Sequence, residues 1–224
     1  MLAILSGGGY LIPLLGVYDS FDEIDFDKLP NQFVLKATHD SGSVVICKDK
    51  KTFDFEKARK KLTRALKYNY FWASREMPYK DVKPRIIAEE YMAELGDISL
   101  VDYKFWVFNG ETKLVFVASD RFGVDGARFD FLDLDFNNLN FGSVGHKRAG
   151  ESLQKPENWE EMKILVNKLA FDDIPFVRID LYNIKGKIYF GEYTFFHDGG
   201  VVAFNPKEWD KNLGDLISLP IIDN

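Results

Sequence analysis

Two short runs near the C-terminus contain charged side chains at strand spacing. Residues 176–182 read Phe-Val-Arg-Ile-Asp-Leu-Tyr, and residues 187–194 read Lys-Ile-Tyr-Phe-Gly-Glu-Tyr-Thr. Because side chains alternate along a strand, Arg178 and Asp180 share one face, and a turn of three residues would set Asp180 opposite Glu192. Two facing carboxylates in an apolar sheet repel each other unless a cation neutralises them. The pattern therefore indicates either a Mg²⁺ site or a structural ion pair with Arg178.

A second candidate for a functional residue is Lys36, which lies within the apolar, strand-like run 32–37. A lysine there either reaches an anion such as phosphate or lies on the solvent side of a half-exposed strand. The following turn, residues 39–43 (His-Asp-Ser-Gly-Ser), offers backbone N–H groups and hydroxyls that could hold phosphate oxygens. Lys48 alternates in a similar way along the return strand 44–48. These features are compatible with a phosphate-binding hairpin.

A third candidate is the run 86–92, Ile-Ile-Ala-Glu-Glu-Tyr-Met. Where a strand leaves its sheet, its unpaired backbone groups can read the edge of an adenine. Met92 would then form an apolar wall, and Asp102 would bind the ribose hydroxyls. The alternative is that Glu89 and Glu90 are simply solvated at a strand end.

The elements that must position these residues follow from the hydrophobic periods. Helical spacing predicts one helix that begins at Phe55 and another over about 157–170. Asn109 and Gly110 between two apolar runs predict a β-hairpin. Residues 122–156 are rich in Gly, Asp and Asn with little period, and we interpret them as a long functional loop. The order of hairpins and helices predicts an α+β chain with mainly antiparallel sheets.

The amino-acid composition excludes several classes of protein. The 224 residues contain 29 Lys and Arg against 35 Asp and Glu, a net charge of −6, which argues against a general nucleic-acid binder. A hydrophobic content of 46% excludes intrinsic disorder. The single cysteine, Cys47, excludes an internal disulfide and a cysteine-built zinc site. Apolar runs fall short of the about 20 residues that span a bilayer, so we expect a cytoplasmic protein.

The order of the motifs resembles that of the ATP-grasp superfamily. Within it, long stretches closely resemble the TupA-like ATP-grasp family, which is associated with teichuronopeptide and capsule-type polysaccharide synthesis: residues 36–50, 83–91, 102–110 and 175–196. The resemblance extends from about Tyr10 to Pro220. It implies two α+β subdomains, with mainly antiparallel sheets, that grip ATP between them. The implied division is a residual N-terminal segment at 1–30, a small subdomain at 31–92 and a large subdomain at 93–224.

The resemblance also implies roles for individual residues. The expected contacts to ATP are the strand lysines, the hairpin tip, the hinge and the ribose carboxylate: Lys36, Ser41, Gly42, Ser43, Lys48, Glu89, Glu90, Met92 and Asp102. The expected Mg²⁺ ligands are Asp180, Glu192 and Thr194, with threonine where many ATP-grasp enzymes have asparagine. The expected catalytic cations, which stabilise charge on the transferring phosphoryl group, are Arg178, Arg121 and Lys104.

The implied reaction is a ligation through an acyl phosphate. A carboxylate attacks the γ-phosphate of ATP, and an amine then displaces phosphate. The implied acceptor is a uronic acid or another carboxyl of a surface glycan, with peripheral contact to a lipid-linked glycan, and the implied amine is an amino acid. Family members usually begin with a longer N-terminal region containing a second phosphate lysine, whereas only residues 1–9 precede Tyr10 here.

Two other functions remain open from the sequence. Asp133 and Asp135 form the Asp-x-Asp pattern of metal-dependent glycosyltransferases, but such a short motif in a loop rich in Asp and Asn favours a solvated loop. The short N-terminal region also allows a non-catalytic remnant that binds ATP.

Overall fold

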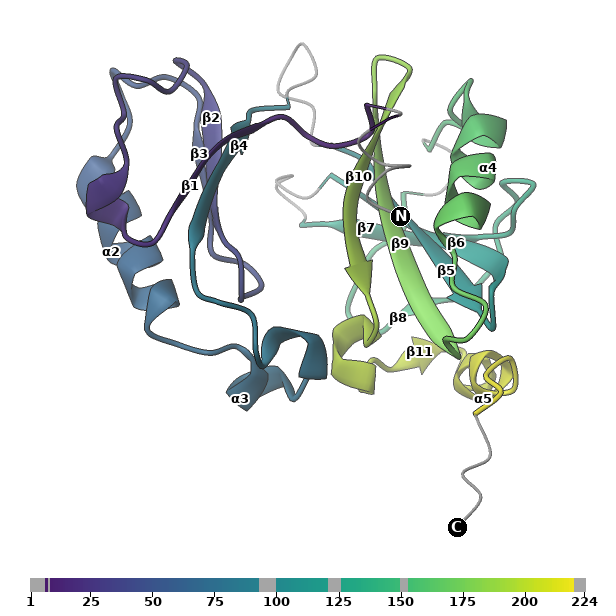
Figure 1. The fold of residues 1–224 in the computed structure, drawn as a ribbon. Helices are drawn as coiled ribbons and strands as arrows, with labels where there is room; N and C mark the ends of the chain where they lie inside the picture. Colours follow the sequence, from purple (N-terminus) through teal and green to yellow (C-terminus); the bar gives the residue numbers. More distant parts are fainter. Residues whose placement is uncertain (1–6, 8, 93–99, 121–125, 150–152, 220–224) are drawn as a thin grey trace. The chain divides into compact units, whose positions relative to one another are not determined.

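The computed structural model describes residues 7, 9–92, 100–120, 126–149 and 153–219, and the chain forms two compact units (Figure 1). The first unit is Ile12–Met92, and the second combines Met1–Leu11 with Ala93–Asn224. Both units are α+β, as the sequence predicts, and all sheet pairings between the named strands are antiparallel. Within the described residues, no helix is long and apolar enough to cross a membrane.

The first unit is a four-stranded sheet with one long helix. Its strand order is β1 (Leu14–Tyr18), β4 (Ile86–Glu90), β2 (Phe33–Ala37) and β3 (Val44–Cys47), and its helices are η1 (Phe21–Glu23), α2 (Phe55–Leu66), α3 (Phe71–Ser74) and η2 (Met77–Tyr79). Burial alternates along β2 and β4, so each strand buries one face and leaves the other half-exposed.

Helix α2 covers the buried face of this sheet. The side chain of Asp54 accepts a hydrogen bond from the backbone N–H of Lys57 at 2.9 Å and thereby caps the helix. Ala58 and Leu62 are buried on one side of α2 and belong to the same core as Cys47. Cys47 is fully buried in this core, and burial raises the pKa of its thiol.

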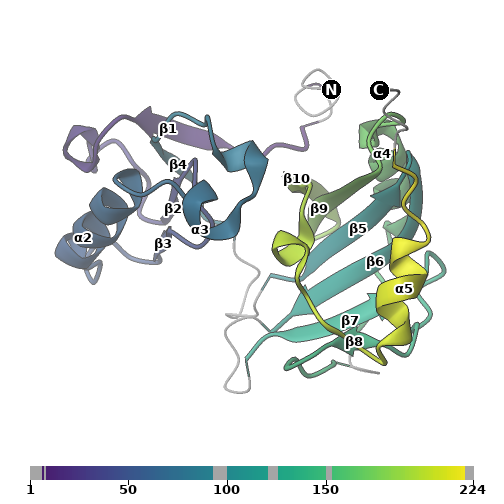
Figure 2. The same ribbon diagram turned by 90° about the horizontal axis from the view of Figure 1, so that it is seen from below.

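The second unit is built on a five-stranded sheet (Figure 2). Its strand order is β10 (Lys187–Thr194), β9 (Phe176–Ile184), β5 (Asp102–Phe108), β6 (Glu111–Ser119) and β7 (Arg128–Leu132), and the other elements are β8 (Gly142–Ser143), α4 (Trp159–Leu169), η4 (His197–Gly200), β11 (Phe204–Asn205) and α5 (Glu208–Gly214). Helix α4 packs on one face, and a second core that includes Phe141, Phe204 and Leu213 covers the other. Strand β5 is buried along its whole length.

Strand β7 corrects the interpretation of residues 122–156 as a long loop. Residues 128–132 pair with β6 and form an edge of the five-stranded sheet. The alternating phenylalanines Phe129 and Phe131 both belong to the second core. This alternation is a strand signal that the surrounding Gly, Asp and Asn residues obscure.

The β9–β10 hairpin sets Asp180 opposite Glu192, as predicted, but by a different route. The turn has two residues, Lys185 and Gly186, both with positive φ, and by itself it would pair Asp180 with the residue before Glu192. A β-bulge between Phe190 and Glu192 shifts the register by one residue. Phe190 therefore packs against the core under α4, whereas uninterrupted alternation would place it on the same face as Glu192.

Candidate active site

A cluster of buried charges lies on one face of the second unit's sheet. Lys104 on β5 pairs in register with Asp180 on β9. Its Nζ forms an ion pair with Asp180 and lies 2.8 Å from a carboxylate oxygen of Asp102. Asp102 and Asp180 are each 1% exposed and Lys104 is 5% exposed. An isolated charge at this depth costs several kcal/mol, so the three groups depend on one another.

Arg178 joins this cluster to β10. Its Nε and Nη2 donate to the two carboxylate oxygens of Asp180 at 2.7 and 2.9 Å, and Nη2 also donates to Glu192 Oε1 at 3.1 Å. Burial acts to raise the pKa of Asp180, but Lys104 and Arg178 outweigh it and hold that pKa below its usual value. Burial acts to lower the pKa of Arg178, but Asp180 outweighs it and raises that pKa. Asp180 and Arg178 therefore remain ionised at neutral pH.

His197 contacts Arg178 on its far side. Arg178 Nη1 lies 2.8 Å from His197 Nδ1, and because a guanidinium can only donate, Nδ1 must be the unprotonated acceptor of a neutral imidazole. Burial lowers the pKa of His197 to about 4, and Arg178 acts in the same direction. The ring packs 4.8 Å from that of Trp106. Sequence reasoning missed this site residue because no motif links it to Arg178.

The shifted pKa of His197 makes stability depend on pH. Between pH 4 and pH 6.5 the unfolded chain binds a proton at this ring that the folded chain does not. The free energy of unfolding should therefore rise by about 3 kcal/mol across this range because of this residue alone. In His197→Asn, whose amide oxygen can accept from Arg178 without titrating, that contribution should vanish. Urea unfolding of both proteins at several pH values measures the difference, and parallel curves would contradict the assignment.

The predicted Mg²⁺ ligands offer oxygen donors at the sheet edge. Thr194 donates to Glu192 Oε1 at 3.0 Å, and the Glu192 side chain is 54% exposed. Asp180 Oδ2 already accepts from both Arg178 and Lys104, whereas Oδ1 accepts from Arg178 alone and keeps a second lone pair. No group of three or more His, Cys, Asp or Glu in the described parts of the chain could enclose a metal. The free lone pair of Asp180 Oδ1 and the 54% exposed carboxylate of Glu192 fit Mg²⁺, which typically takes one or two protein carboxylates and completes its shell with water and phosphate.

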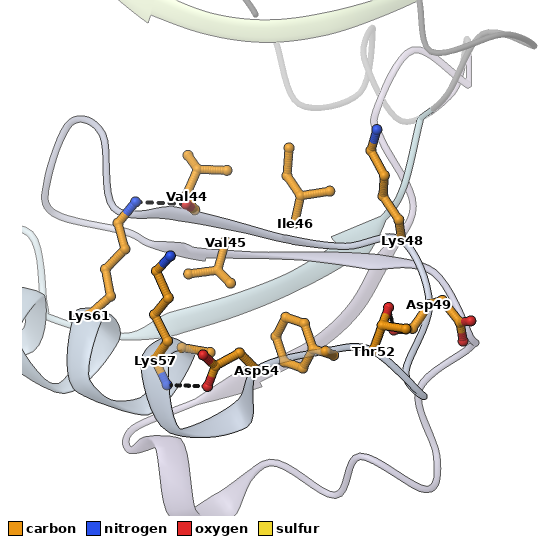
Figure 3. A pocket seen from close by; sticks show the side chains of 11 residues that line it. Val44, Val45, Ile46, Lys48, Asp49, Thr52, Asp54, Lys57 and Lys61 are labelled. Atoms are coloured by element: carbon orange, nitrogen blue, oxygen red, sulfur yellow. Dashed lines mark hydrogen bonds between the residues drawn. The ribbon is translucent and has the colours of Figure 1, made fainter.

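In the first unit, Lys36 and Glu89 form an ion pair of 2.5 Å across β2 and β4. Both side chains lie on the sheet face opposite α2, which also carries the half-exposed apolar side chains Val34, Ile46 and Ile87. Figure 3 shows Ile46 and Lys48 pointing to the same side of β3. This face combines apolar surface with a single cation–anion pair. Sequence reasoning identified Lys36 and Glu89 separately as site residues, but it predicted neither their ion pair nor their apolar neighbours.

The side chain of Asp40 holds together the turn of residues 39–43, which the sequence predicts to bind phosphate. The Asp40 carboxylate accepts the backbone N–H of Ser43 at 3.1 Å and also the hydroxyl of Ser43. Ser41 and Gly42 are exposed, and the backbone of Gly42 has a φ of +99°. His39, which the sequence placed at the tip, is instead fully buried, and its ring nitrogen lies 3.0 Å from the carbonyl oxygen of Ala65.

The predicted hinge begins as a regular strand. Glu89 is paired on both sides of β4, and the backbone N–H of Glu90 donates to the carbonyl oxygen of Pro13 at 3.0 Å. Glu90 is exposed and Met92 is half-buried. Arg121, the remaining predicted catalytic cation, lies outside the described residues.

A pocket of about 450 Å³ lies beside β3 and the start of α2, lined by Val44, Val45, Ile46, Lys48, Asp49, Thr52, Phe53, Asp54, Lys57, Ala58 and Lys61 (Figure 3). Of the predicted site residues, only Lys48 lines it. Lys61 on α2 donates to the carbonyl oxygen of Val44 on the edge strand β3 at 2.9 Å, and it thereby satisfies a backbone group that an edge strand otherwise leaves unpaired.

The Asp-x-Asp pattern forms a turn. Asp133 Oδ1 accepts the backbone N–H groups of Asp135 and Asn137 at 2.9 and 2.7 Å, and Oδ2 accepts the side-chain amide of Asn137 at 3.0 Å. Both carboxylate oxygens of Asp133 therefore accept hydrogen bonds from residues of the same turn, as in an Asx-turn. This geometry favours the solvated-loop interpretation over a glycosyltransferase metal site.

Comparisons with known proteins bear on the family and the fold of the chain. The TupA-like ATP-grasp family model matches residues 1–218, and a search of curated proteins finds no match. Among solved structures, the D-alanine–D-alanine ligase from Helicobacter pylori is 16% identical with a TM-score of 0.50, covering 98% of this chain and 60% of that one. The N5-carboxyaminoimidazole synthetase from Staphylococcus aureus is 14% identical with a TM-score of 0.46, covering 88% and 43%.

The D-alanine–D-alanine ligase from Bacillus anthracis, complexed with ATP, is 16% identical with a TM-score of 0.46, covering 87% of this chain and 52% of that one. The chain thus spans about half the length of these solved structures. At these identities, the match to the Helicobacter pylori ligase shows the fold alone, and that fold is ATP-grasp.

Proposed function

Because the chain belongs to the TupA-like ATP-grasp family, we propose that it is an ATP- and Mg²⁺-dependent carboxylate–amine ligase. The observation that carries the proposal is the buried cluster of the second unit. There Lys104 and Arg178 are held on one sheet face against Asp180, with Glu192 at the edge. Phosphoryl transfer depends mainly on positioning and charge stabilisation, which such a cluster can supply.

The proposed reaction has two steps. A carboxylate oxygen of the acceptor attacks the γ-phosphorus of ATP, the bond to the β-phosphate oxygen breaks, and ADP leaves behind an acyl phosphate. The amine then attacks the acyl carbon, the bond to the phosphate oxygen breaks, and the nitrogen loses a proton. The products are an amide, ADP and inorganic phosphate.

Residues of the second unit would act on the reacting groups. The Arg178 guanidinium is fixed by Asp180 and His197, so it would offer donors to the transferring phosphoryl group without reorganising. Asp180, Glu192 and Thr194 would hold Mg²⁺, which neutralises phosphate charge when bound. Lys104 would keep Asp180 ionised, and Asp102 is its second counter-ion.

Residues of the first unit would bind the nucleotide. The phosphates of ATP would compete with Glu89 for Lys36, because both are anions within reach of the same ammonium. The apolar face with Val34, Ile46 and Ile87 suits a planar base. The exposed hairpin tip would cover the phosphates. Lys48, at the other end of β3 from the tip, would add a second cation on this face, and Glu90 and Met92 would line the adenine.

For the substrates, we propose a uronic acid of a bacterial surface polysaccharide as acceptor and an amino acid as amine. The family association with teichuronopeptide and capsule synthesis supports this choice, as does the need for a carboxylate and an amine in the chemistry. Because the reaction consumes ATP, we propose that it takes place in the cytoplasm, with a lipid-linked glycan as the form of the acceptor.

An isotope experiment tests the proposed reaction. The protein is incubated with MgATP, an amino-acid mixture and glucuronate oligosaccharides labelled with ¹⁸O in their carboxyl groups. We expect ¹⁸O in the released phosphate, because an acyl phosphate passes one carboxyl oxygen to phosphorus. Phosphate that carries oxygen from water alone would contradict ligation. ATP binding without phosphate release from any acceptor would favour the non-catalytic remnant.

A further inference from the structure

The segment of residues 68–82 in the first unit exposes large apolar side chains that the proposed function does not use. Tyr68 is 50% exposed, Trp72 62%, Met77 56% and Val82 37%. Single exposed apolar residues are ordinary, but several within one short segment typically mark a binding surface. The exposed indole of Trp72 is the largest of these groups.

The segment is held in place by local contacts. The side chain of Asn69 donates to the carbonyl oxygen of Lys80 at 2.9 Å and accepts the backbone N–H of Phe71 at 2.9 Å. The rings of Tyr70 and Tyr79 meet edge to face at 5.0 Å. Phe71 is 9% exposed and anchors α3. The exposed rings are therefore presented on an ordered scaffold, which lowers the entropy cost of binding.

Two cations lie on these rings without an acidic partner. The Arg75 guanidinium lies 5.5 Å from the ring centre of Trp72 and 5.8 Å from that of Phe71, and Lys80 Nζ lies 5.7 Å from the latter. Among the described residues, neither cation forms an ion pair. A stacked guanidinium keeps the N–H donors along its edge available for a carboxylate.

The backbone at Arg75 is strained. Its φ is +61° and its ψ is 15°, in the left-handed region that non-glycine residues rarely adopt. Such strain costs about 1 kcal/mol or more, and it often occurs where function fixes a side chain. Here it ends α3 after Ser74 and directs the arginine over the two preceding aromatic rings.

From these observations we propose that residues 68–82 form a binding platform for an acidic polysaccharide. The apolar C–H face of a pyranose ring stacks on Trp72, and a carboxylate of the sugar pairs with Arg75, with Lys80 as a second cation. A neutral glycan would leave both cations unpaired. The proposal rests on the proposed function, since it names where the chain would hold its glycan acceptor.

Calorimetric titration with a galacturonate hexasaccharide, without ATP, tests the platform. The wild-type protein should bind it and should bind the carboxyl-reduced, neutral hexasaccharide at least tenfold more weakly. Trp72→Ala should weaken binding at least tenfold, and Arg75→Gln should abolish the preference for the acidic sugar. Ile164→Ala, which truncates a similarly exposed apolar residue on α4, should bind as the wild type does.

Each variant is also titrated with a non-hydrolysable ATP analogue and Mg²⁺, which shows that it is folded. Wild-type protein that binds the analogue but not the hexasaccharide, or Trp72→Ala that binds the hexasaccharide unchanged, would overturn the platform and leave the proposed function intact. Failure to bind the analogue would count against the proposed function instead. A single-stranded oligonucleotide that binds in place of the sugar, and is lost in Trp72→Ala, would also overturn the proposal.

Discussion

Replacing Arg178 with lysine should lower the rate of phosphoryl transfer by about 10²–10³-fold, the loss typical for removal of a positioned donor to a developing anion. Arg178 donates to both oxygens of Asp180, to Glu192 and to His197. A lysine keeps the positive charge but cannot make this planar set of hydrogen bonds. We expect the loss mainly in kcat, with little change in the KM for ATP. Phosphate release under saturating substrates measures it.

Arg59→Lys is the matched control, because the Arg59 guanidinium forms an ion pair with Asp22 on an exposed surface. This variant should retain wild-type kcat. If Arg178→Lys kept kcat within threefold of the wild type while remaining folded, the assignment of Arg178 as the catalytic cation would be wrong.

Replacing Asp180 with asparagine should affect both stability and nucleotide binding. The change preserves the size of the side chain but removes the anion that pairs with Lys104 and Arg178. Because breaking a buried ion pair leaves charges uncompensated, we expect the free energy of unfolding to fall by about 3–5 kcal/mol. The Mg²⁺-dependent part of ATP affinity should also be lost. Urea unfolding and calorimetry measure the two effects separately.

Asp25→Asn serves as the control for this prediction, since Asp25 forms an ion pair with Lys28 on the surface. Exposed pairs contribute little, so its free energy of unfolding should stay close to that of the wild type. An Asp180→Asn protein as stable as this control would contradict the dependence of the cluster on Asp180. If Asp180→Asn bound ATP with wild-type affinity in the presence of Mg²⁺, the role of Asp180 as a metal ligand would be contradicted.

Local periodicity was sufficient to predict much of the fold. Strand alternation predicted which face of β9 carries Arg178 and Asp180, and the Asn109-Gly110 turn predicted the β5–β6 hairpin. The helix that begins at Phe55 was predicted from the same kind of pattern. These features depend on residues close in sequence, so their signals are present in short windows.

The remaining features depend on contacts between distant parts of the chain. The bulge after Phe190 has no local signal except a glycine, and it decides which face Glu192 occupies. His197 reaches Arg178 only because η4 follows the end of β10. Phe196 is of a residue type that is most often buried, yet it is 43% exposed at this same turn. Only the assembled sheet determines these three positions.

Calorimetric titration of the wild-type protein with a non-hydrolysable ATP analogue, with and without Mg²⁺, distinguishes an ATP-dependent ligase from a glycosyltransferase. We expect binding that is tighter with Mg²⁺ and is weakened at least tenfold by Lys36→Met, which removes the ammonium that pairs with Glu89. The ligase proposal would be contradicted if the protein did not bind the analogue but bound a UDP- or GDP-sugar, and if Asp133→Ala abolished that sugar binding.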